Sequence, residues 1–376
     1  MAEPLKRTRL YAWHVEHGGR MVPFAGWEMP VQYPSGPLEE HHTTRRAAGL
    51  FDIDHMGQMD VRGPDAEAFV NRLVTYDVRK MKLFEAHYAL MCYADGGIVD
   101  DLFVYKLPDR SDEAGRPYFF LVVNASNREK DVAWAQAHAG DWDVDVRDLS
   151  DETYMLAFQG PQAPAILDRL THANLGEMPR FTAVTDSMFE DVPVLIGRTG
   201  YTGEDGFELF FPAEHALIVW EGILQAGAAQ GVKPIGLAAR DSLRFEPCMP
   251  LYGHEISADI TPVEAGLSFA VSLDKDFYGR DALLRQKLEK PEYVLAAFEM
   301  VDKGVPRQGY EVASNGLSVG EVTTGMFSPT TERYVGLAYV PRELAALDTE
   351  LEILIRDKPK RAKVVKKPFY VPAYRR

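Results

Sequence analysis

The 376-residue sequence contains only two cysteines, Cys92 and Cys248, which lie far apart along the chain. They form neither a CxxC pair nor a zinc-ligand spacing, so we expect free thiols and no structural disulfide. Apolar runs are short, and none approaches the roughly 20 residues that span a bilayer. The N-terminal segment also lacks the continuous apolar core of a secretory signal. These absences predict a cytoplasmic protein without a membrane partner.

Positive charge is also scarce: 41 Lys and Arg stand against 56 Asp and Glu, which gives a formal net charge of −15. Because phosphate contacts dominate affinity for nucleic acids, this balance argues against a nucleic-acid partner. Residues 356–376 are the exception, with nine Lys or Arg against one Asp. This basic tail is either a charged edge strand that resists sheet-to-sheet pairing or an attractor for an anionic ligand or an acidic partner.

Common catalytic motifs are missing as well. The sequence has no GxGxxG, no GxxxxGK(S/T) and no HExxH, which excludes the usual dinucleotide, P-loop and zinc-protease signatures. The histidines are scattered without metal-ligand spacing. We therefore expect no metal centre.

One glycine-rich segment, "RTGYTGEDGFEL" (198–209), resembles a phosphate loop only superficially. Glu204 and Asp205 lie inside it and would repel a phosphate, and it has no lysine. The glycines either permit the positive φ angles of a tight turn between strands or let the backbone approach a flat ligand. In the second case Tyr201 would supply a stacking face and Glu208 a hydrogen-bond acceptor.

Length and pattern predict more than one domain. A chain of this size exceeds a single compact core, so two or three domains are expected. Residues 53–144 show the order strand, helix, three strands, helix, which is typical of a compact α+β unit. Beyond about residue 275 the pattern changes to short strands separated by turn signals, which predicts a small barrel or sandwich.

The segment "GGIVDDLFVY" (96–105) places two acids, Asp100 and Asp101, at the start of an apolar strand. Side chains alternate along a strand, so Asp101 shares a face with Phe103 and Tyr105, while Asp100 lies on the other face. Both faces are otherwise apolar, which disfavours charge. Either one acid is a functional carboxylate or both are solvated at the end of a hairpin turn; alternation alone does not choose.

Two arginines, Arg240 and Arg244, lie four residues apart in "GLAARDSLRFE" (236–246) and so share a helix face. They could form surface ion pairs with Asp241 and Glu246, which contribute little to stability. Alternatively, one arginine binds a carboxylate or carbonyl of a ligand through its planar guanidinium.

Ten segments occur in a fixed order along the chain: "MVPFAGWEMPVQY", "LFDIDHMGQ", "GGIVDDLFVY", "VVNASN", "FQGPQA", "RTGYTGEDGFEL", "GLAARDSLRFE", "PLYGHEI", "TPVEAGL" and "VVKKPFY". Each alone would be weak, but ten in register are highly specific. Together they closely resemble the aminomethyltransferase, or T-protein, family of the glycine cleavage system, and the resemblance covers the chain from about Tyr11 to Arg376.

The resemblance implies an α+β fold of three domains around a central folate channel. Residues 1–52 and 145–275 would form a discontinuous folate-binding domain. Residues 53–144 would form an inserted ferredoxin-like α+β unit, and residues 276–376 a small C-terminal β-barrel. The bounds of the inserted unit and of the barrel agree with the changes of sequence pattern described above.

The resemblance also implies an activity. Such enzymes take the aminomethyl group from the lipoyl arm of H-protein, release ammonia and pass the one-carbon unit to tetrahydrofolate, giving 5,10-methylenetetrahydrofolate. The implied co-substrate is tetrahydrofolate and the implied partner is lipoylated H-protein. We expect a monomer when the protein is free.

By position in these motifs, Asp101 matches the family's essential aspartate, near N10 of the folate. Glu208 matches the acceptor for the pterin edge, and Arg240 matches an arginine that binds folate or substrate. The other implied folate-contacting positions are Met56, Tyr88, Asn124, Tyr201, Phe269, Tyr374 and Arg375.

The chain departs from the family pattern at three places. Phe269 stands where many relatives carry Trp, Cys248 replaces a usually small residue, and Asp54 stands where Ser is common. None of these positions carries an implied catalytic role, and we interpret them as variation that alters the shape of the channel.

Three alternatives keep a folate-binding fold. A tetrahydrofolate-dependent demethylase would take a methyl group from sulfur or oxygen. An iron–sulfur assembly factor would carry a motif like KGCYxGQE, whereas "KDFYGRDAL" (275–283) has no cysteine. The folate-binding half of a flavin-dependent amine dehydrogenase would need a dinucleotide-binding domain upstream, for which this chain leaves no room. We expect the aminomethyltransferase.

Overall fold

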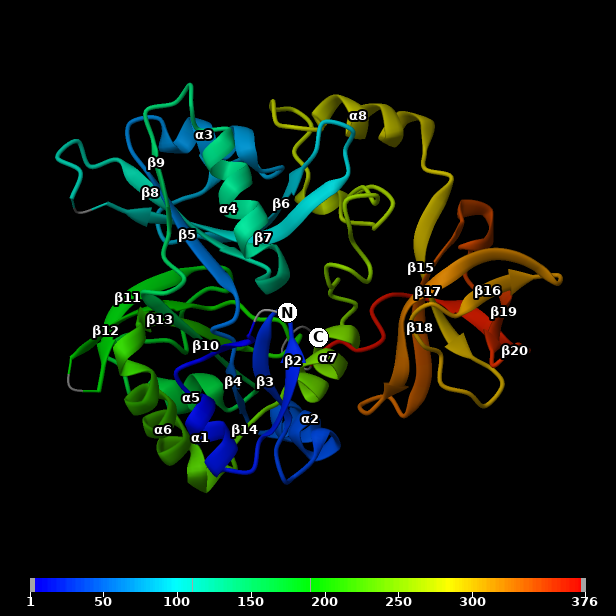
Figure 1. Ribbon diagram of the computed structural model, residues 1–376, viewed down its shortest axis with the longest axis horizontal. Coiled ribbons are helices and arrows are strands. Elements are labelled where there is room, and N and C mark those ends of the chain that lie inside the picture. The colour runs from blue at the N-terminus through cyan, green and yellow to red at the C-terminus, as the bar shows by residue number, and fades with distance from the viewer. Residues whose placement is uncertain (1–3, 110, 190, 373–376) are drawn as a thin grey trace. The chain divides into compact units, whose positions relative to one another are not determined.

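The computed structural model describes residues 4–109, 111–189 and 191–372 (Figure 1). By its internal contacts the chain divides into two compact units. Unit 1 comprises Met1–Leu73, Asp77–Tyr88 and Leu102–Leu243, and unit 2 comprises Val74–Tyr76, Ala89–Asp101 and Arg244–Arg376. The predicted contact residues Tyr374 and Arg375 lie outside the described residues.

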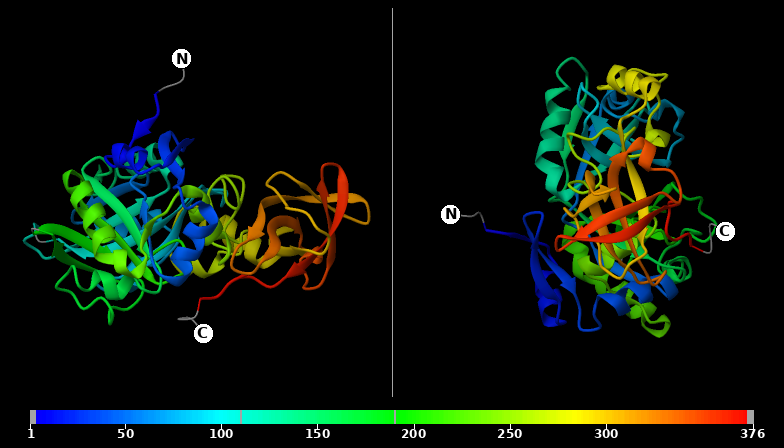
Figure 2. Two further views of the ribbon diagram at one scale, coloured as in Figure 1. Left: turned by 90° about the horizontal axis from the view of Figure 1, so that it is seen from below. Right: turned by 90° about the vertical axis from the view of Figure 1, so that its right-hand side faces the viewer.

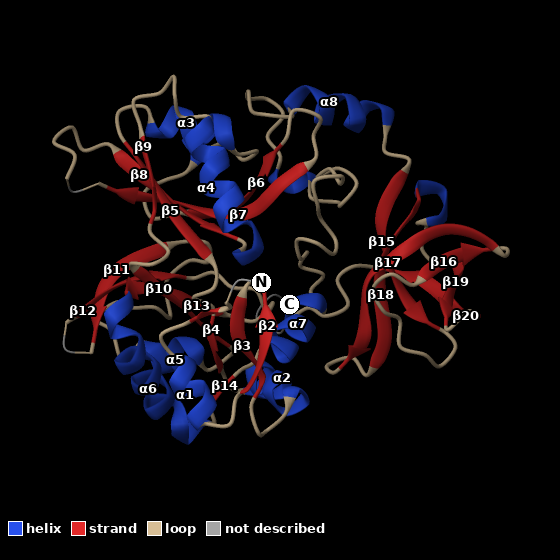
Figure 3. Ribbon diagram, in the orientation of Figure 1, coloured by secondary structure: helices blue, strands red, loops and turns tan. Residues whose placement is uncertain are grey.

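Unit 1 is built on a six-stranded mixed sheet with the order β11-β12-β13-β10-β4-β14. Its strands are β4 (Gly49–Asp52), β10 (Thr153–Gln159), β11 (Ala183–Met188), β12 (Val192–Gly197), β13 (Gly206–Pro212) and β14 (Lys233–Pro234). Helices α1 (Tyr11–Glu16), α5 (Ala163–Leu167) and α6 (Ala216–Gly227) pack against one face of this sheet (Figure 3). Alternate residues of the strands, such as Leu156 and Leu209, join Trp13 and Trp220 in the buried cluster between the layers.

The opposite face of this sheet packs against a second sheet. Its strand order is β6-β7-β8-β5-β9, and the division between the units falls within β6 and β7. The strands are β5 (Gly57–Arg62), β6 (Ala86–Cys92), β7 (Ile98–Pro108), β8 (Pro117–Val123) and β9 (Asp145–Asp148). Within unit 1, Tyr105 and Phe120 of this sheet share a buried cluster with Phe51, Ala157 and Phe210 of the first. Along each strand of the first sheet, residues that face the second sheet therefore alternate with residues that face the helices.

The remaining elements of unit 1 are short. A three-stranded sheet has the order β1-β3-β2, with β1 (Lys6–Arg7), β2 (Arg20–Phe24) and β3 (Trp27–Gln32). The other helices are α2 (Pro37–Arg46), α3 (Ala66–Leu73) and α4 (Arg128–Ala137), while α7 (Leu237–Phe245) ends where unit 2 begins.

Unit 2 contains a closed six-stranded barrel with the order β15-β18-β17-β16-β19-β20 (Figure 2). The strands are β15 (Tyr293–Met300), β16 (Glu311–Ser314), β17 (Leu317–Ser328), β18 (Arg333–Pro341), β19 (Glu350–Ile355) and β20 (Lys358–Val365), and α8 (Arg280–Glu289) precedes them. The predicted α+β class and the predicted C-terminal barrel are confirmed. The interpretation of the basic tail as an edge strand is wrong, because β20 pairs with both β19 and β15.

Short 3-10 segments connect these elements: η1 (Val78–Lys80), η2 (Ala125–Asn127), η3 (Ala213–His215), η4 (Ala228–Gln230), η5 (Ser268–Ala270) and η6 (Arg342–Leu344). Among the residues described, no helix has both the length and the apolar character needed to cross a membrane.

Two sequence interpretations need correction. Asp100 is fully buried, so it is not a solvated residue at the end of the turn, whereas Asp101 is half-buried. Arg244 does not pair with Glu246 at the surface. Its guanidinium is buried and lies 2.7 Å from the Glu255 carboxylate, and it also donates to the Thr324 hydroxyl.

Candidate functional site

A small hollow in unit 1 brings together three of the predicted ligand-binding residues, Tyr201, Glu208 and Arg240. Its walls come from β4, β10 and β13, from the loop between β12 and β13, and from α7. The complete lining is Phe51, Ile53, Ala157, Gln159, Tyr201, Thr202, Glu208 and Arg240. The hollow therefore combines apolar walls with one carboxylate, one amide, two hydroxyls and one guanidinium.

Strand register explains why Glu208 faces the hollow. Glu208 on β13 lies opposite Ala157 on β10, and Ala157 lies opposite Phe51 on β4. These three residues form one row across the sheet, and the small Ala157 side chain in its centre leaves space above the strands. On the other side of Glu208 the row continues through Gly197 of β12 to Ala183 of β11. A Cβ atom at Gly197 would lie 2.7 Å from the Tyr105 hydroxyl oxygen, so glycine is required for Tyr105 to reach this place.

The Glu208 carboxylate is buried and held on one side. The Thr199 hydroxyl donates to Oε2, and the Tyr105 hydroxyl lies 3.5 Å from the same oxygen. Burial raises the pKa of Glu208, while the hydroxyls of Thr199 and Tyr105 and the charge of Arg240 act in the opposite direction. Among the residues that the structure describes, no hydrogen bond reaches Oε1. Glu208 thus keeps acceptor capacity for a ligand.

Arg240 and Tyr201 form the opposite part of the hollow. The Arg240 guanidinium lies 4.8 Å from the centre of the Tyr201 ring, a cation–π distance. Helix α7 places Arg240 in its first turn, and the amide of Gly236 just before that helix donates to buried Glu40. Of the two arginines on this helix face, Arg240 lines the hollow, whereas Arg244 belongs to the buried pair with Glu255.

The loop that carries Tyr201 is fixed from three directions. Gln159 Nε2 donates to the carbonyls of Thr199 and Phe207, and its Oε1 accepts from the Thr202 hydroxyl. Arg45 donates to the Thr202 carbonyl and to the Glu204 carboxylate. The acids that argued against a phosphate loop are thus structural, since Asp205 is likewise paired with Arg198 at 2.6 Å.

If the hollow binds tetrahydrofolate, as the family resemblance implies, Gln159→Ala should weaken that binding about tenfold, because it frees the loop that carries Tyr201 and leaves buried carbonyls without donors. Calorimetric titration would measure the change in Kd. Gln162→Ala, an exposed position three residues further on, is the matched control and should bind as the wild type does. Equal affinities for the two variants would contradict a role for the loop.

The other predicted contact residues are distributed over both units. Tyr88 on β6 lies 6.0 Å from Phe103 between ring centres, and Met56 packs against the buried cluster that includes Phe51. Asn124 precedes η2 at the end of β8. Asp101 and Phe269 belong to unit 2, and Phe269 is 76% exposed. Contacts of these five residues with a ligand remain predictions.

Sequence reasoning missed the residues that support Glu208. Tyr105 carried a usable signal, since strand alternation already placed it on the face of Asp101 at the end of the apolar run. Thr199 and Gln159 carried none, because their role depends on contacts between strands that are distant in the sequence.

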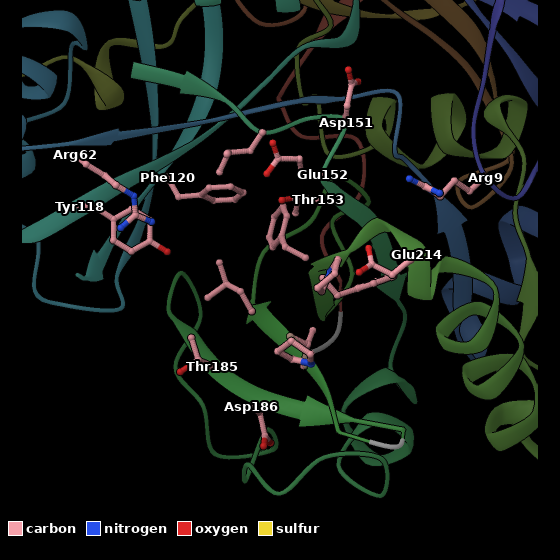
Figure 4. A pocket seen from close by; sticks show the side chains of 17 residues that line it. Arg9, Arg62, Tyr118, Phe120, Asp151, Glu152, Thr153, Thr185, Asp186 and Glu214 are labelled. Carbon is pink, nitrogen blue, oxygen red and sulfur yellow. The ribbon is translucent and has the colours of Figure 1, made fainter. Parts of the chain in front are cut away.

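A larger groove, with a volume of about 740 Å³, also lies in unit 1 (Figure 4). Its lining includes the apolar side chains of Phe120 and Phe210. Four acids on the lining, Asp151, Glu152, Asp186 and Glu214, outnumber its two arginines, Arg9 and Arg62, so the net negative charge disfavours a ligand that carries carboxylates, such as a folate. The smaller hollow has no such excess of acids, since its lining carries one carboxylate and one guanidinium.

A buried polar network lies beside the turn that follows β4. Asp52 accepts hydrogen bonds from the Thr8 hydroxyl and from His14, whose other ring nitrogen meets the Tyr33 hydroxyl at 2.8 Å. Burial opposes the charge on Asp52, but these bonds hold its pKa below the usual range. Asp54 is buried next to this charge. Burial and the Asp52 carboxylate raise the pKa of Asp54 to about 9, so it is a neutral acid at pH 7.

Asp54→Asn is expected to stabilise the protein by an amount that grows with pH. The folded chain keeps a proton on Asp54 that the unfolded chain releases above about pH 4, so the stability tied to this proton falls as pH rises toward 9. The slope is at most about 1.4 kcal/mol per pH unit, so the variant should gain about 2–3 kcal/mol on the wild type between pH 6 and pH 8. Urea unfolding at both pH values measures this gain.

The exposed Asp141→Asn variant is the control for the loss of one charge. It should show no such trend. A difference between Asp54→Asn and the wild type that stays constant with pH would contradict a protonated Asp54.

In the part of the chain that the structure describes, no group of three or more His, Cys, Asp or Glu is placed to hold a metal ion. The chemistry of the hollow is that of hydrogen bonds, charge and ring stacking. It suits a flat heterocycle with N–H donors on one edge.

Comparison with known proteins identifies close relatives. Residues 10–275 match the family model described as the GCVT N-terminal domain, and residues 294–370 match the glycine cleavage T-protein C-terminal barrel domain. The aminomethyltransferase of Symbiobacterium thermophilum is 50% identical over the full length of both chains. That of Alkaliphilus oremlandii is 48% identical over 97% of this chain and 98% of its own.

A solved structure is similar over the same length. The crystal structure of the glycine cleavage system aminomethyltransferase T from Bartonella henselae shares 34% identity and a TM-score of 0.90. The match covers 98% of this chain and 99% of that one.

Proposed function

The chain belongs to the glycine cleavage T-protein family and is an aminomethyltransferase, and from this premise we propose the substrates and the residues that act on them. The one-carbon acceptor is tetrahydrofolate, and the donor is the aminomethyl group on the lipoyl arm of H-protein. The pterin ring of the folate binds in the hollow lined by Tyr201, Glu208 and Arg240.

The observation that carries this proposal is the carboxylate of Glu208. It is buried on an otherwise apolar strand face and accepts from the protein on Oε2, which leaves Oε1 for a ligand. A pterin presents an amino group and a ring N–H side by side, and one carboxylate accepts both. Tyr201 supplies a flat aromatic face, and Arg240 places a positive charge near carbonyl or carboxylate groups of the ligand.

Asp101 acts at the reacting carbon in this proposal. The bond between the carbon and the lipoyl sulfur breaks, and the sulfur leaves as a thiolate. The carbon passes through a cationic iminium state, N5 of the folate attacks it, and ammonia leaves as N10 closes the ring. A fixed carboxylate near this centre stabilises the positive charge and orients N10.

The basic strand β20 and the residues after it are proposed as the attractor for an acidic lipoyl carrier. Arg361 and Lys363 of this strand pair with Asp302 and Asp348, whereas the exposed Lys358 and Lys366 add to the positive charge. Because exposed charges are screened by salt, complex formation with H-protein should weaken as ionic strength rises.

Donor choice tests the proposed function. Wild-type protein and tetrahydrofolate are incubated either with aminomethyl-loaded H-protein or with methyl donors that carry the group on sulfur or oxygen. The proposal predicts 5,10-methylenetetrahydrofolate from the first donor only. Formation of 5-methyltetrahydrofolate from a methyl donor would instead identify a demethylase of the same fold.

A further inference from the structure

Two hydroxyl groups behind Glu208 form an ordered chain. The Tyr105 hydroxyl lies 2.8 Å from Thr199 Oγ1, and the Thr199 hydroxyl donates to Glu208 Oε2. Each hydroxyl has one hydrogen to donate. With Thr199 donating to Glu208, Tyr105 donates to Thr199, so both donors point toward the carboxylate, and such chains strengthen cooperatively.

Both hydroxyl groups are themselves fixed. The Tyr105 ring is fully buried between the two sheets of unit 1, with edge contacts to Phe210 at 5.7 Å between ring centres. Gly197 has no side chain and so provides the space for the Tyr105 hydroxyl. The backbone of Thr199 is held by Gln159, which donates to its carbonyl at 3.0 Å. Neither hydroxyl can turn away from Glu208 without breaking a buried contact.

We propose that Thr199 and Tyr105 are positioning residues that hold Glu208 as an acceptor aimed into the hollow, and thereby select ligands with two adjacent N–H donors. The Thr199 hydroxyl, itself held by Tyr105, donates to Oε2 from behind, which fixes the plane of the carboxylate and directs Oε1 and the remaining lone pair of Oε2 toward the hollow. The ligand class is an aminopyrimidinone edge, as in a reduced pterin. For the identity of the ligand, the inference rests on the proposed function.

The arrangement also favours the ionised form of Glu208. The Thr199 hydroxyl donates more strongly to a charged carboxylate than to a neutral carboxyl, so this hydrogen bond lowers the pKa of Glu208. The other group that faces Glu208 is Arg240, whose charge acts in the same direction, while burial opposes both. Removal of the Thr199 hydroxyl should therefore raise the pKa of Glu208 further above its ordinary value.

The first test measures tetrahydrofolate affinity between pH 5.5 and pH 8.5 for Thr199→Val, Thr199→Ser and Tyr105→Phe. Thr199→Val, which keeps the shape of the side chain, should bind about tenfold more weakly at pH 7, and the acid side of its binding profile should move to higher pH by about one unit. Thr199→Ser should restore both properties, and Tyr105→Phe should give a smaller change in the same direction.

Two control variants make the same kinds of substitution, Thr to Val and Tyr to Phe, at other positions of unit 1. Thr185→Val on β11 and Tyr118→Phe on β8 lie outside the hollow and should bind as the wild type does. A weaker affinity of Thr199→Val that is the same at every pH would mean that Thr199 serves only the fold, and it would overturn the inference.

The second test needs no ligand. Carboxyl ¹³C NMR of glutamate-labelled protein, with the Glu208 signal assigned by its loss in Glu208→Gln, follows the titration of Glu208 in the free protein. A higher pKa in Thr199→Val than in the wild type supports the positioning role, and an unchanged pKa contradicts it. If the wild type binds no tetrahydrofolate at any pH, the proposed function fails while this titration still decides the inference.

Discussion

Asp101→Ala is expected to lower the turnover of aminomethyl transfer by about 10²–10³-fold, the usual cost of losing one group that stabilises charge in a transition state. The reacting carbon becomes cationic as the thiolate leaves, and the variant removes the negative charge proposed to stand beside it. Because Asp101 is only half-buried, the fold should tolerate the change. Steady-state kinetics with loaded H-protein and tetrahydrofolate, together with thermal unfolding, measure the effect.

Two further variants locate the cause. Asp101→Asn keeps the size of the side chain and one acceptor oxygen but removes the charge. If the charge is what matters, the turnover of Asp101→Asn should be nearly as low as that of Asp101→Ala. Asp95→Asn changes an exposed acid in the turn before the same strand, where it accepts from the Gly97 amide, and should leave turnover unchanged. Wild-type turnover in a folded Asp101→Ala variant would remove Asp101 from the mechanism.

Glu208→Gln is expected to weaken tetrahydrofolate binding by at least about 100-fold. The amide offers one acceptor oxygen and places an NH₂ group against an N–H donor of the ligand, so two hydrogen bonds to a charged acceptor are lost or reversed. Each such bond contributes about 1.5–3 kcal/mol, and 1.4 kcal/mol corresponds to a factor of ten. Calorimetric titration at pH 7.5 gives the Kd.

The exposed Glu214→Gln in η3 of the same unit is the matched control for this substitution, and its affinity should equal that of the wild type. Since burial raises the pKa of Glu208, its protonated fraction grows as pH falls, and wild-type binding should weaken on the acid side. In Glu208→Gln this acid-side loss should be absent. An affinity of Glu208→Gln equal to that of the wild type would exclude Glu208 as the pterin acceptor.

Local pattern was sufficient for those parts of the fold that depend on neighbours in sequence. The change to short strands beyond residue 275 correctly indicated an all-β unit but left a barrel and a sandwich open, because alternation and turn residues are visible in a single strand whereas closure is not. The same alternation placed Asp100 and Asp101 on opposite faces. It did not show that Asp100 is fully buried, since burial depends on what packs against that face.

Long-range pairing explains the interpretations that failed. Whether β20 is an edge strand depends on its partners β19 and β15, which lie at different distances along the chain. Arg244 pairs with Glu255 rather than with Glu246, because the chain after α7 folds back on the helix within unit 2. The local sequence predicts a charged helix face whether Arg244 pairs with Glu246 or with Glu255.

The residues of the candidate site also fall into two groups, those that a local motif predicts and those that depend on long-range contacts. Tyr201, Glu208 and Arg240 were predicted from their motifs, and the structure brings the three to one hollow. Thr199, Tyr105 and Gln159 are ordinary residues whose importance comes only from the contacts they make. Their support for Glu208 depends on the register of β12, β13 and β10, which no local pattern reveals.

Ammonia release tests the central claim most directly. Aminomethyl-loaded H-protein is incubated with the wild-type protein, with and without tetrahydrofolate, and ammonia and folate products are quantified together. The account predicts rapid release that depends on tetrahydrofolate, with one 5,10-methylenetetrahydrofolate formed for each ammonia. Release at the same rate without tetrahydrofolate, or ammonia without the folate product, would contradict it.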